Sequence, residues 1–144
     1  MTDLQRVFTY LRTLAEIEPS DLAGIEGRYR TETFSAKDVI FSEGDHYVKV
    51  AFILKGLVKK YYVTHEGRKF IKEFTWENQI TTPYASLLQN IPATYSLEAI
   101  EDTTLLTIDY AVIDGLIRSH PKWLAIGKAL ADYHFLNREA REME

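Results

Sequence analysis

The hydrophobic and polar positions of residues 39–75 follow the two-residue period of β-strands. Three segments rich in β-branched and aromatic residues are separated by two glycine turns, Lys55-Gly56 and Glu66-Gly67. The first segment is predicted to place these residues on one buried face: Val48, Val50, Phe52 and Leu54. Three short strands at this spacing predict a meander within an antiparallel barrel or sandwich.

At both ends of the chain, apolar residues recur with the period of α-helices instead of the two-residue period of strands. Apolar residues at three- and four-residue steps predict a first helix that begins near Thr2 or Asp3, and Ser20 or Asp21 is expected to cap a short second helix after Pro19. Further strands are expected at residues 28–34, 94–99 and 103–109. A short helix at 111–118 is expected to precede a long one that begins at Pro121, because proline suits the first turn of a helix.

The long helix carries two apolar stripes. One contains Trp123, Ile126, Leu130 and Tyr133, and the other contains Leu124, Ala131 and Phe135. Both stripes are compatible with packing on the chain's own barrel and preceding helix, or one of them with a two-fold dimer. Because residues 137–144 are mostly good helix formers without a closing Gly or Pro, we expect the natural chain to continue beyond residue 144.

Composition narrows the class of protein. A chain of 144 residues without cysteine fits a single domain that has neither disulfides nor thiolate metal sites. The sequence has no secretory or membrane-spanning pattern, so the cytoplasm is the expected location. A net charge of −4 argues against this chain itself wrapping a nucleic acid, and the following basic residues are interpreted as solvated strand faces: Lys59, Lys60, Arg68, Lys69 and Lys72.

Several segments in the same order resemble the Crp/Fnr family of transcription regulators. They are residues 41–44, 52–56, 65–67 and 97–102, followed by the long helix that a proline begins. The resemblance covers nearly the whole chain and is nearest to the divergent Crp-like regulators common in Bacteroidetes.

The resemblance implies a mainly β fold with flanking α-helices. This fold is an eight-stranded double-stranded β-helix, the jelly roll of cyclic nucleotide-binding domains, plus a long C-terminal dimerisation helix. Residues 1–144 would form one domain, with N-terminal helices at 1–27, the β-barrel at 28–109 and C-terminal helices at 111–144. The helix-turn-helix DNA-binding domain of such regulators is expected to be absent from this chain.

The phosphate-binding cassette of the family departs from its pattern in this sequence. In the family, a Gly-Glu pair opens a short helix, the Glu binds the ribose hydroxyl and an Arg neutralises the phosphate. Here Pro83-Tyr84 and Ala93-Thr94 occupy those positions, and only Thr94 matches. Proline has no N–H, tyrosine is no carboxylate and alanine has no charge, so ordinary cAMP binding is not expected.

The cassette is still the candidate ligand site. The residues expected to line it are Tyr84, Ser86, Thr94, Tyr95, His134 and Arg138. An anionic or aromatic ligand would use the His, the Arg and the phenol hydroxyls. The competing interpretation is a pocket that is empty or filled by its own residues, in which these side chains have ordinary packing, capping or surface roles.

Enzyme chemistry is not supported by the sequence. The four histidines lack metal-binding spacing, and no serine lies in a nucleophile-elbow context. A cupin-type enzyme on the same barrel would need such a metal cluster. We therefore expect no catalytic residue, no metal and no cofactor.

These observations predict the sensor and dimerisation domain of a Crp/Fnr-like regulator. The partners expected are a second copy of the chain, an unknown small-molecule effector, and DNA only through the missing domain. The dimer seam is expected to contain Trp123, Ile126, Leu130, Tyr133 and Asn137. The alternative is a stand-alone small-molecule-binding module that acts through a protein partner.

Overall fold

A computed structural model describes the backbone of residues 1–142 and the side chains of residues 1–132. The chain divides into two compact units. One unit is Tyr29–Tyr110, and the other combines Met1–Arg28 with Ala111–Glu144.

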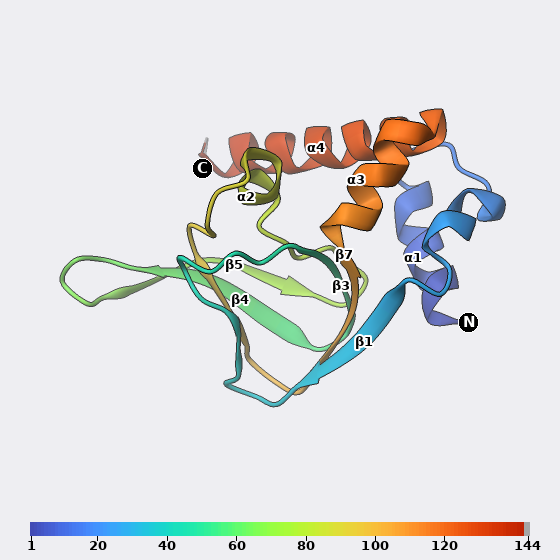
Figure 1. Cartoon of the computed structure of the whole chain (residues 1–144). Coiled ribbons are helices and arrows are strands. Elements are labelled where there is room, and N and C mark those ends of the chain that lie inside the picture. Colours follow the sequence, from blue (N-terminus) through green and yellow to red (C-terminus); the bar gives the residue numbers. More distant parts are fainter. Residues whose placement is uncertain (143–144) are drawn as a thin grey trace. The chain divides into compact units, whose positions relative to one another are not determined.

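The unit Tyr29–Tyr110 is a jelly roll of two antiparallel sheets (Figure 1). Its elements are β1 (Tyr29–Phe34), β2 (Val39–Phe41), β3 (Lys49–Lys55), β4 (Leu57–Val63), β5 (Lys69–Trp76), α2 (Tyr84–Gln89), β6 (Ser96–Ala99) and β7 (Thr103–Asp109). The first sheet has the order β1-β7-β3, and the second has the order β2-β6-β4-β5. This architecture confirms the predicted fold.

The core lies between the two sheets. Ala51, Ile53 and Leu105 of the first sheet pack with Val58 and Leu97 of the second sheet. All five side chains are fully buried. The prediction that β3 has only one buried side is wrong, because residues 51–54 are all buried. The sequence of a strand that is covered on both faces is a continuous run of apolar residues, without alternation of apolar and polar residues.

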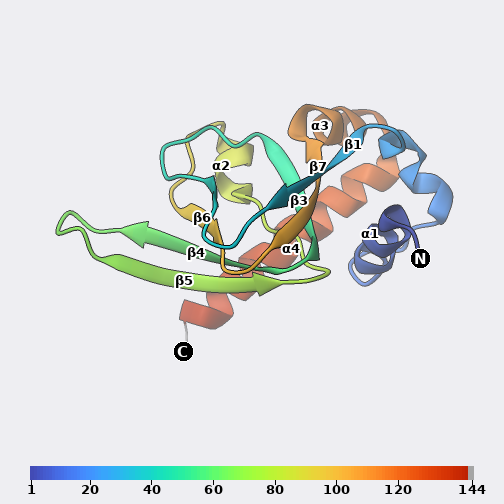
Figure 2. The same cartoon turned by 90° about the horizontal axis from the view of Figure 1, so that it is seen from below.

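The predicted meander is also wrong at its first turn. Strands β3 and β4 flank Gly56 but lie in different sheets, so Gly56 joins one sheet to the other. Only β4 and β5 form the expected hairpin around Gly67, with Val63 opposite Lys69. This hairpin projects beyond the other strands in both views (Figures 1 and 2).

Within the part of the chain whose backbone is described there are seven strands, whereas the family resemblance implied eight. Residues 78–81 run beside β3 without forming a named strand: Ile80 bridges to Phe52, and the Thr81 N–H donates to the Ala51 carbonyl at 2.8 Å. The Asn78 and Gln79 backbones bond to the same residue, Ile53, which breaks the regular ladder.

The second unit begins with α1 (Asp3–Arg12). The helix begins where the sequence predicted, and Thr2 caps it through a reciprocal capping box with Gln5. The next element is a 3₁₀ helix, η1 (Pro19–Ile25), and its cap is Glu18 instead of Ser20 or Asp21. The Asp21 carboxylate accepts from the Glu18 N–H at 2.7 Å, so Asp21 completes the cap from inside the turn.

Two helices complete this unit, α3 (Tyr110–Ser119) and α4 (Pro121–Glu142). Trp123, Ile126 and Leu130 are buried, and the Trp123 indole N–H donates to the Asp21 carbonyl at 2.9 Å. The first apolar stripe of α4 therefore has partners within the chain, whereas Leu124 of the second stripe is 59% exposed. Among the described residues, none of the helices combines the length and apolar character needed to span a membrane.

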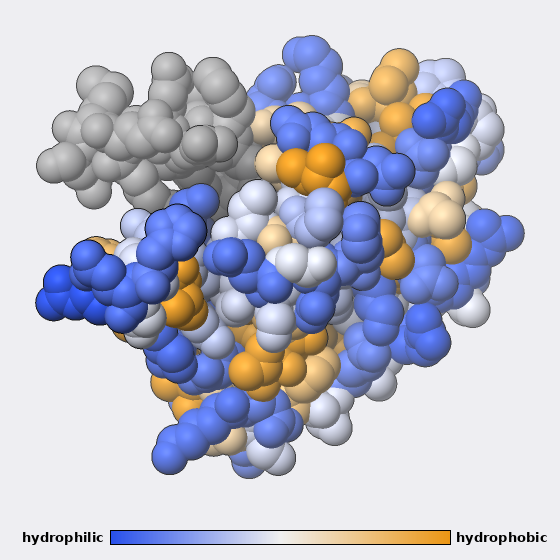
Figure 3. Space-filling model, turned by 60° about the vertical axis from the view of Figure 1, so that its left-hand side comes forward, coloured by the Kyte–Doolittle hydropathy of each residue, from blue (hydrophilic) through white to orange (hydrophobic). Residues whose placement is uncertain are grey.

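The surface of the described residues mixes apolar and charged side chains. Figure 3 shows one face, on which hydrophobic side chains lie in separate groups among hydrophilic ones. Several of the exposed apolar residues belong to the β4–β5 hairpin: Tyr62, Val63, Phe70, Ile71, Phe74 and Trp76.

Candidate functional site

Helix α2 stands where the sequence predicted the opening of a ligand cassette. Pro83 precedes its first residue, contributes no N–H, and is fully buried. The Tyr84 N–H is directed back to the Thr82 carbonyl at 2.8 Å. Tyr84 is half-buried, and this burial, with a smaller effect of Tyr110, raises the pKa of its phenol. Ser86 is buried within the helix.

The segment that leads into β6 is held by the loop after β2. The Ala93 N–H donates to the Asp45 carbonyl at 2.8 Å, and the Ala93 carbonyl accepts from the Gly44 N–H at 2.8 Å. Ala93 is 3% exposed and belongs to the barrel core. Thr94 is exposed. Both backbone polar groups of Ala93 are thus satisfied within the barrel.

Tyr95 lies inside the barrel. Its phenol hydroxyl donates to the Thr82 carbonyl at 3.1 Å, and its ring lies 5.7 Å from the ring of Phe41. Burial, and to a smaller extent the charge of Glu73, raises the pKa of the Tyr95 phenol. The phenol therefore remains protonated at neutral pH and can keep donating to Thr82.

Two lysines approach the Tyr95 ring from the second sheet. The ammonium groups of Lys60 and Lys72 lie 5.2 Å and 5.6 Å from the ring centroid. Lys60 also forms an ion pair with Glu73 at 3.2 Å and is only 9% exposed. The interpretation of Lys60 as a solvated strand residue is therefore wrong.

Sequence reasoning missed this group of charges, although one signal was present. Lys60 is two residues after Val58, which is an interior residue of β4. Since alternate residues of a strand lie on the same face, the sequence alone already places a lysine on the core face. Glu73 and Lys72 gave no such signal, because their positions depend on the pairing of β5 with β4.

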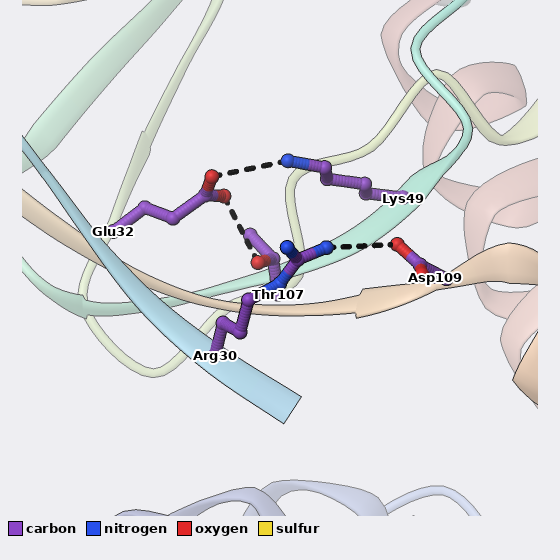
Figure 4. A network of polar contacts seen from close by, with 5 residues as sticks. All are labelled: Arg30, Glu32, Lys49, Thr107 and Asp109. Atoms are coloured by element: carbon purple, nitrogen blue, oxygen red, sulfur yellow. Dashed lines mark hydrogen bonds and ion pairs between the residues drawn. The ribbon is translucent and has the colours of Figure 1, made fainter. Parts of the chain in front are cut away.

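A second polar network lies on the first sheet (Figure 4). The Glu32 carboxylate accepts from the Lys49 ammonium at 3.0 Å and from the Thr107 hydroxyl at 2.9 Å. Arg30 pairs with Asp109 at 3.3 Å. The Glu32 carboxylate and the Arg30 guanidinium are therefore bonded to different side chains.

The network stabilises the charged form of Glu32. Burial alone would raise the pKa of Glu32, but the hydrogen bonds from Lys49 and Thr107, together with the charges of Lys49 and Arg30, lower it below its ordinary value of 4.5. Because Arg30 and Asp109 are more than half exposed, their ion pair contributes little to stability.

Three buried hydroxyl groups have no hydrogen-bond partner among the described residues: those of Tyr47, Thr75 and Thr81. Thr75 is 3% exposed and Thr81 is 0% exposed. Burial, with a smaller effect of Glu32, raises the pKa of Tyr47, whose ring stacks on Phe41 at 4.6 Å. A buried hydroxyl without a partner costs about 1–3 kcal/mol, so each marks a place where water or a ligand group would be stabilised.

The predicted site residues have separate positions. Tyr84 and Ser86 lie on α2, whereas Thr94 and Tyr95 lie just before β6, and the Tyr95 hydroxyl donates a hydrogen bond to the Thr82 carbonyl. His134 and Arg138 of the ligand set, and Tyr133 and Asn137 of the dimer seam, lie outside the residues whose side chains are described. In the described part, no group of three or more His, Cys, Asp or Glu residues is arranged to hold a metal.

Comparison with known proteins identifies the type of domain. The family model described as the cyclic nucleotide-binding domain matches residues 31–120. No curated protein sequence matches the chain.

Solved structures share the fold at low sequence identity. The chain is similar to a catabolite activator protein from Thermus thermophilus, with 22% identity and a TM-score of 0.74, over 93% of this chain and 59% of that one. The N-terminal domain of a transcriptional regulator from Streptomyces coelicolor A3(2) has 18% identity and a TM-score of 0.72, over 96% and 95%. The sensor domain of the transcriptional regulator DNR from Pseudomonas aeruginosa has 16% identity and a TM-score of 0.76, over 97% and 91%.

Proposed function

Because the chain belongs to the family of cyclic nucleotide-binding domains, we propose that it is the sensor and dimerisation domain of a Crp/Fnr-like transcription regulator. The similarity to a transcriptional regulator's sensor domain over 97% of the chain supports this role. As in Crp-like regulators of the divergent type, the DNA-reading function would belong to a separate helix-turn-helix domain.

We also propose that this sensor does not bind cAMP in the way that is usual for the family. Residues of the barrel interior support this part of the proposal. Ala93 stands at the family's arginine position and is buried in the core, so no guanidinium is supplied there for a cyclic phosphate. Pro83 and Tyr84 stand at the Gly-Glu positions and supply neither the first N–H nor the carboxylate. The loss of the charge-assisted contact to the phosphate alone would cost about 1.5–3 kcal/mol.

The mechanism we propose is allosteric. An effector inside the barrel, or a constitutive packing state of the barrel, biases α4 between two arrangements in a homodimer. These arrangements set the distance between the two DNA-binding domains of the dimer. That distance selects operators whose half-sites have the matching spacing. A cytoplasmic location follows from this role.

The dimer requires a surface on α4. Trp123, Ile126 and Leu130 of the expected seam are buried within the chain, so their contact with a second copy remains a prediction. Among the described residues of α4, Leu124 is a large apolar side chain that is exposed, at 59%, and is available to contact a second copy. We therefore include Leu124 in the seam.

Light scattering tests the dimer. The chain at high concentration is expected to have twice the monomer mass, and Leu124→Glu is expected to shift it toward monomer. Leu88→Glu is the matched control, because Leu88 of α2 is similarly exposed, at 56%. Only monomer for the unsubstituted chain at high concentration would count against the dimerisation role.

The reading frame beyond Glu144 tests the regulator role and distinguishes it from the alternative. A continuation with a helix-turn-helix pattern is expected. A natural chain without any such domain would favour the stand-alone module that binds a small molecule and acts through a protein partner.

A further inference from the structure

The inner face of the β4–β5 hairpin carries charged side chains at its barrel end. Val58 and Lys60 of β4 lie opposite Thr75 and Glu73 of β5. Because directly paired residues share a face and Val58 is in the core, Lys60, Glu73 and Thr75 also face the barrel interior. A lysine, a carboxylate and a hydroxyl therefore stand together at the wall of the interior.

A β-bulge adds a second lysine to this face. Lys60 pairs with Glu73 and the next residue, Tyr61, pairs with Ile71, so Lys72 is the extra residue of β5. A bulge re-aims the side chain of its extra residue. Here the bulge explains how the Lys72 ammonium reaches 5.6 Å from the centroid of the buried Tyr95 ring, although Glu73 beside it also faces inward.

The charges of this group do not balance. Lys60 is neutralised by Glu73 at 3.2 Å, whereas no described carboxylate lies within ion-pairing distance of Lys72. One positive charge is left over beside a buried phenol ring. The Lys72 side chain as a whole is exposed, but its ammonium lies beside this buried ring, where an uncompensated positive charge attracts an anion.

An unpartnered hydroxyl adds independent evidence that a ligand group belongs here. Thr75 is 3% exposed, and its Oγ1 has no hydrogen-bond partner among the described residues. It follows Glu73 on the same face of β5, a separation of about 7 Å along a strand. An oxygen of a bound anion would satisfy this hydroxyl as well as the charge of Lys72.

We propose that Lys72, Lys60 and Thr75 form an anion subsite on the inner face of the β4–β5 hairpin, beside the ring of Tyr95. The subsite takes the carboxylate or phosphate group of a small molecule. It lies on strands of the second sheet and uses ammonium groups and a threonine hydroxyl, with no residue of the α2 segment. The inference rests on the proposed function in one respect, that the sensor's effector enters the barrel.

Nuclear magnetic resonance of the ¹⁵N-labelled full chain tests the subsite with simple probes. Sodium phosphate and sodium acetate are titrated separately at constant ionic strength, with sodium chloride as the reference. We expect saturable shifts of the amide signals of residues 60 and 72–75 with phosphate, acetate or both, and the probe that saturates at lower concentration identifies the anionic group. Shifts that match those of chloride would overturn the proposal.

Two variants connect the binding to the proposed side chains. Lys72→Met keeps the aliphatic stem and is expected to weaken the binding of the anion roughly tenfold. Lys69→Met is the matched control, because Lys69 pairs with Glu98 and is expected to leave binding unchanged. Equal effects of both variants would show non-specific screening and would contradict the subsite.

Thr75→Val tests the hydroxyl. This variant replaces a buried, unpartnered group with an isosteric apolar one, so the fold is expected to be retained. We expect anion binding several-fold weaker, and unchanged binding would remove Thr75 from the subsite and contradict the proposal. Failure of these titrations would leave the scattering and reading-frame tests of the sensor role unaffected.

Discussion

The Tyr95 hydroxyl donates a hydrogen bond to the Thr82 carbonyl at 3.1 Å. This bond connects the residue before β6 to the segment just before α2. The residue is 9% exposed and belongs to the core cluster. The barrel at this point is therefore filled by a side chain of the protein itself.

Substitution of Tyr95 measures what this filling contributes. Tyr95→Phe removes one of two hydrogen bonds that the Thr82 carbonyl accepts, the other coming from the Tyr84 N–H, and is expected to lower the free energy of unfolding by about 1 kcal/mol. Tyr95→Ala also leaves a cavity and is expected to cost about 3–5 kcal/mol. Urea denaturation measures both values. Tyr62→Phe, at a position that is 42% exposed, is the control and should change stability by less than about 0.5 kcal/mol.

The Glu32 network predicts a dependence of stability on pH. Since the pKa of Glu32 is lower in the folded chain than its ordinary value of 4.5, its contribution is complete above that pH and is lost as pH falls through the folded pKa. Glu32→Gln is expected to be about 1 kcal/mol less stable at pH 7. The difference should shrink below about pH 4.5, as measured by thermal unfolding across pH.

A matched variant separates this network from general charge effects. Glu66→Gln, at the exposed turn of the hairpin, is expected to follow the unsubstituted chain at every pH. A constant difference between Glu32→Gln and the unsubstituted chain from pH 3 to pH 7 would contradict the account.

Gly56 is expected to be much less tolerant of a side chain than Gly67. Both have positive φ, 114° and 82° respectively, which disfavours alanine in each case. At Gly56 a Cβ would also lie 2.7 Å from the Thr103 Cα, whereas Gly67 has no atom within 4 Å. We expect Gly67→Ala to cost about 1 kcal/mol and Gly56→Ala to cost about 3 kcal/mol, by urea denaturation. Similar costs would contradict the close approach of the two sheets at Gly56.

Trp123 is expected to stabilise the helical unit through its indole N–H. Trp123→Phe removes the donor to the Asp21 carbonyl and reduces the packed volume, so a loss of about 2 kcal/mol is expected. Trp76→Phe is the control, because Trp76 is 55% exposed, and should cost less than about 0.5 kcal/mol. A Trp123→Phe variant as stable as the control would contradict the burial of this face of α4.

Local signals predicted most of the elements. The start of the first helix near Thr2 and the hairpin at Gly67 depend on residues that are near one another in the sequence, and both are confirmed. The division into two sheets was missed because β3 pairs with β7, whose residues lie 49 to 60 positions further along the chain, and Gly56 has the sequence of an ordinary hairpin turn. Burial of β3 on both faces likewise depends on long-range packing.

The candidate site was less predictable for the same reason. The substitutions Pro83, Tyr84 and Ala93 were visible in the sequence because the family pattern fixes their positions. The packing of Tyr95 depends on its hydrogen bond to Thr82, and the approach of the Lys72 ammonium to the Tyr95 ring depends on a bulge in the pairing of β4 with β5. Neither relationship follows from the composition or period of one segment.

Calorimetric titration of the chain with cAMP tests the central claim most directly. With Ala93 in place of an arginine and Tyr95 inside the barrel, we predict no saturable heat at micromolar concentrations, and the same result with cGMP. Saturable binding of cAMP at micromolar concentration would contradict the account, because it would require a carboxylate and a cation for the ribose and phosphate that the described cassette residues do not supply.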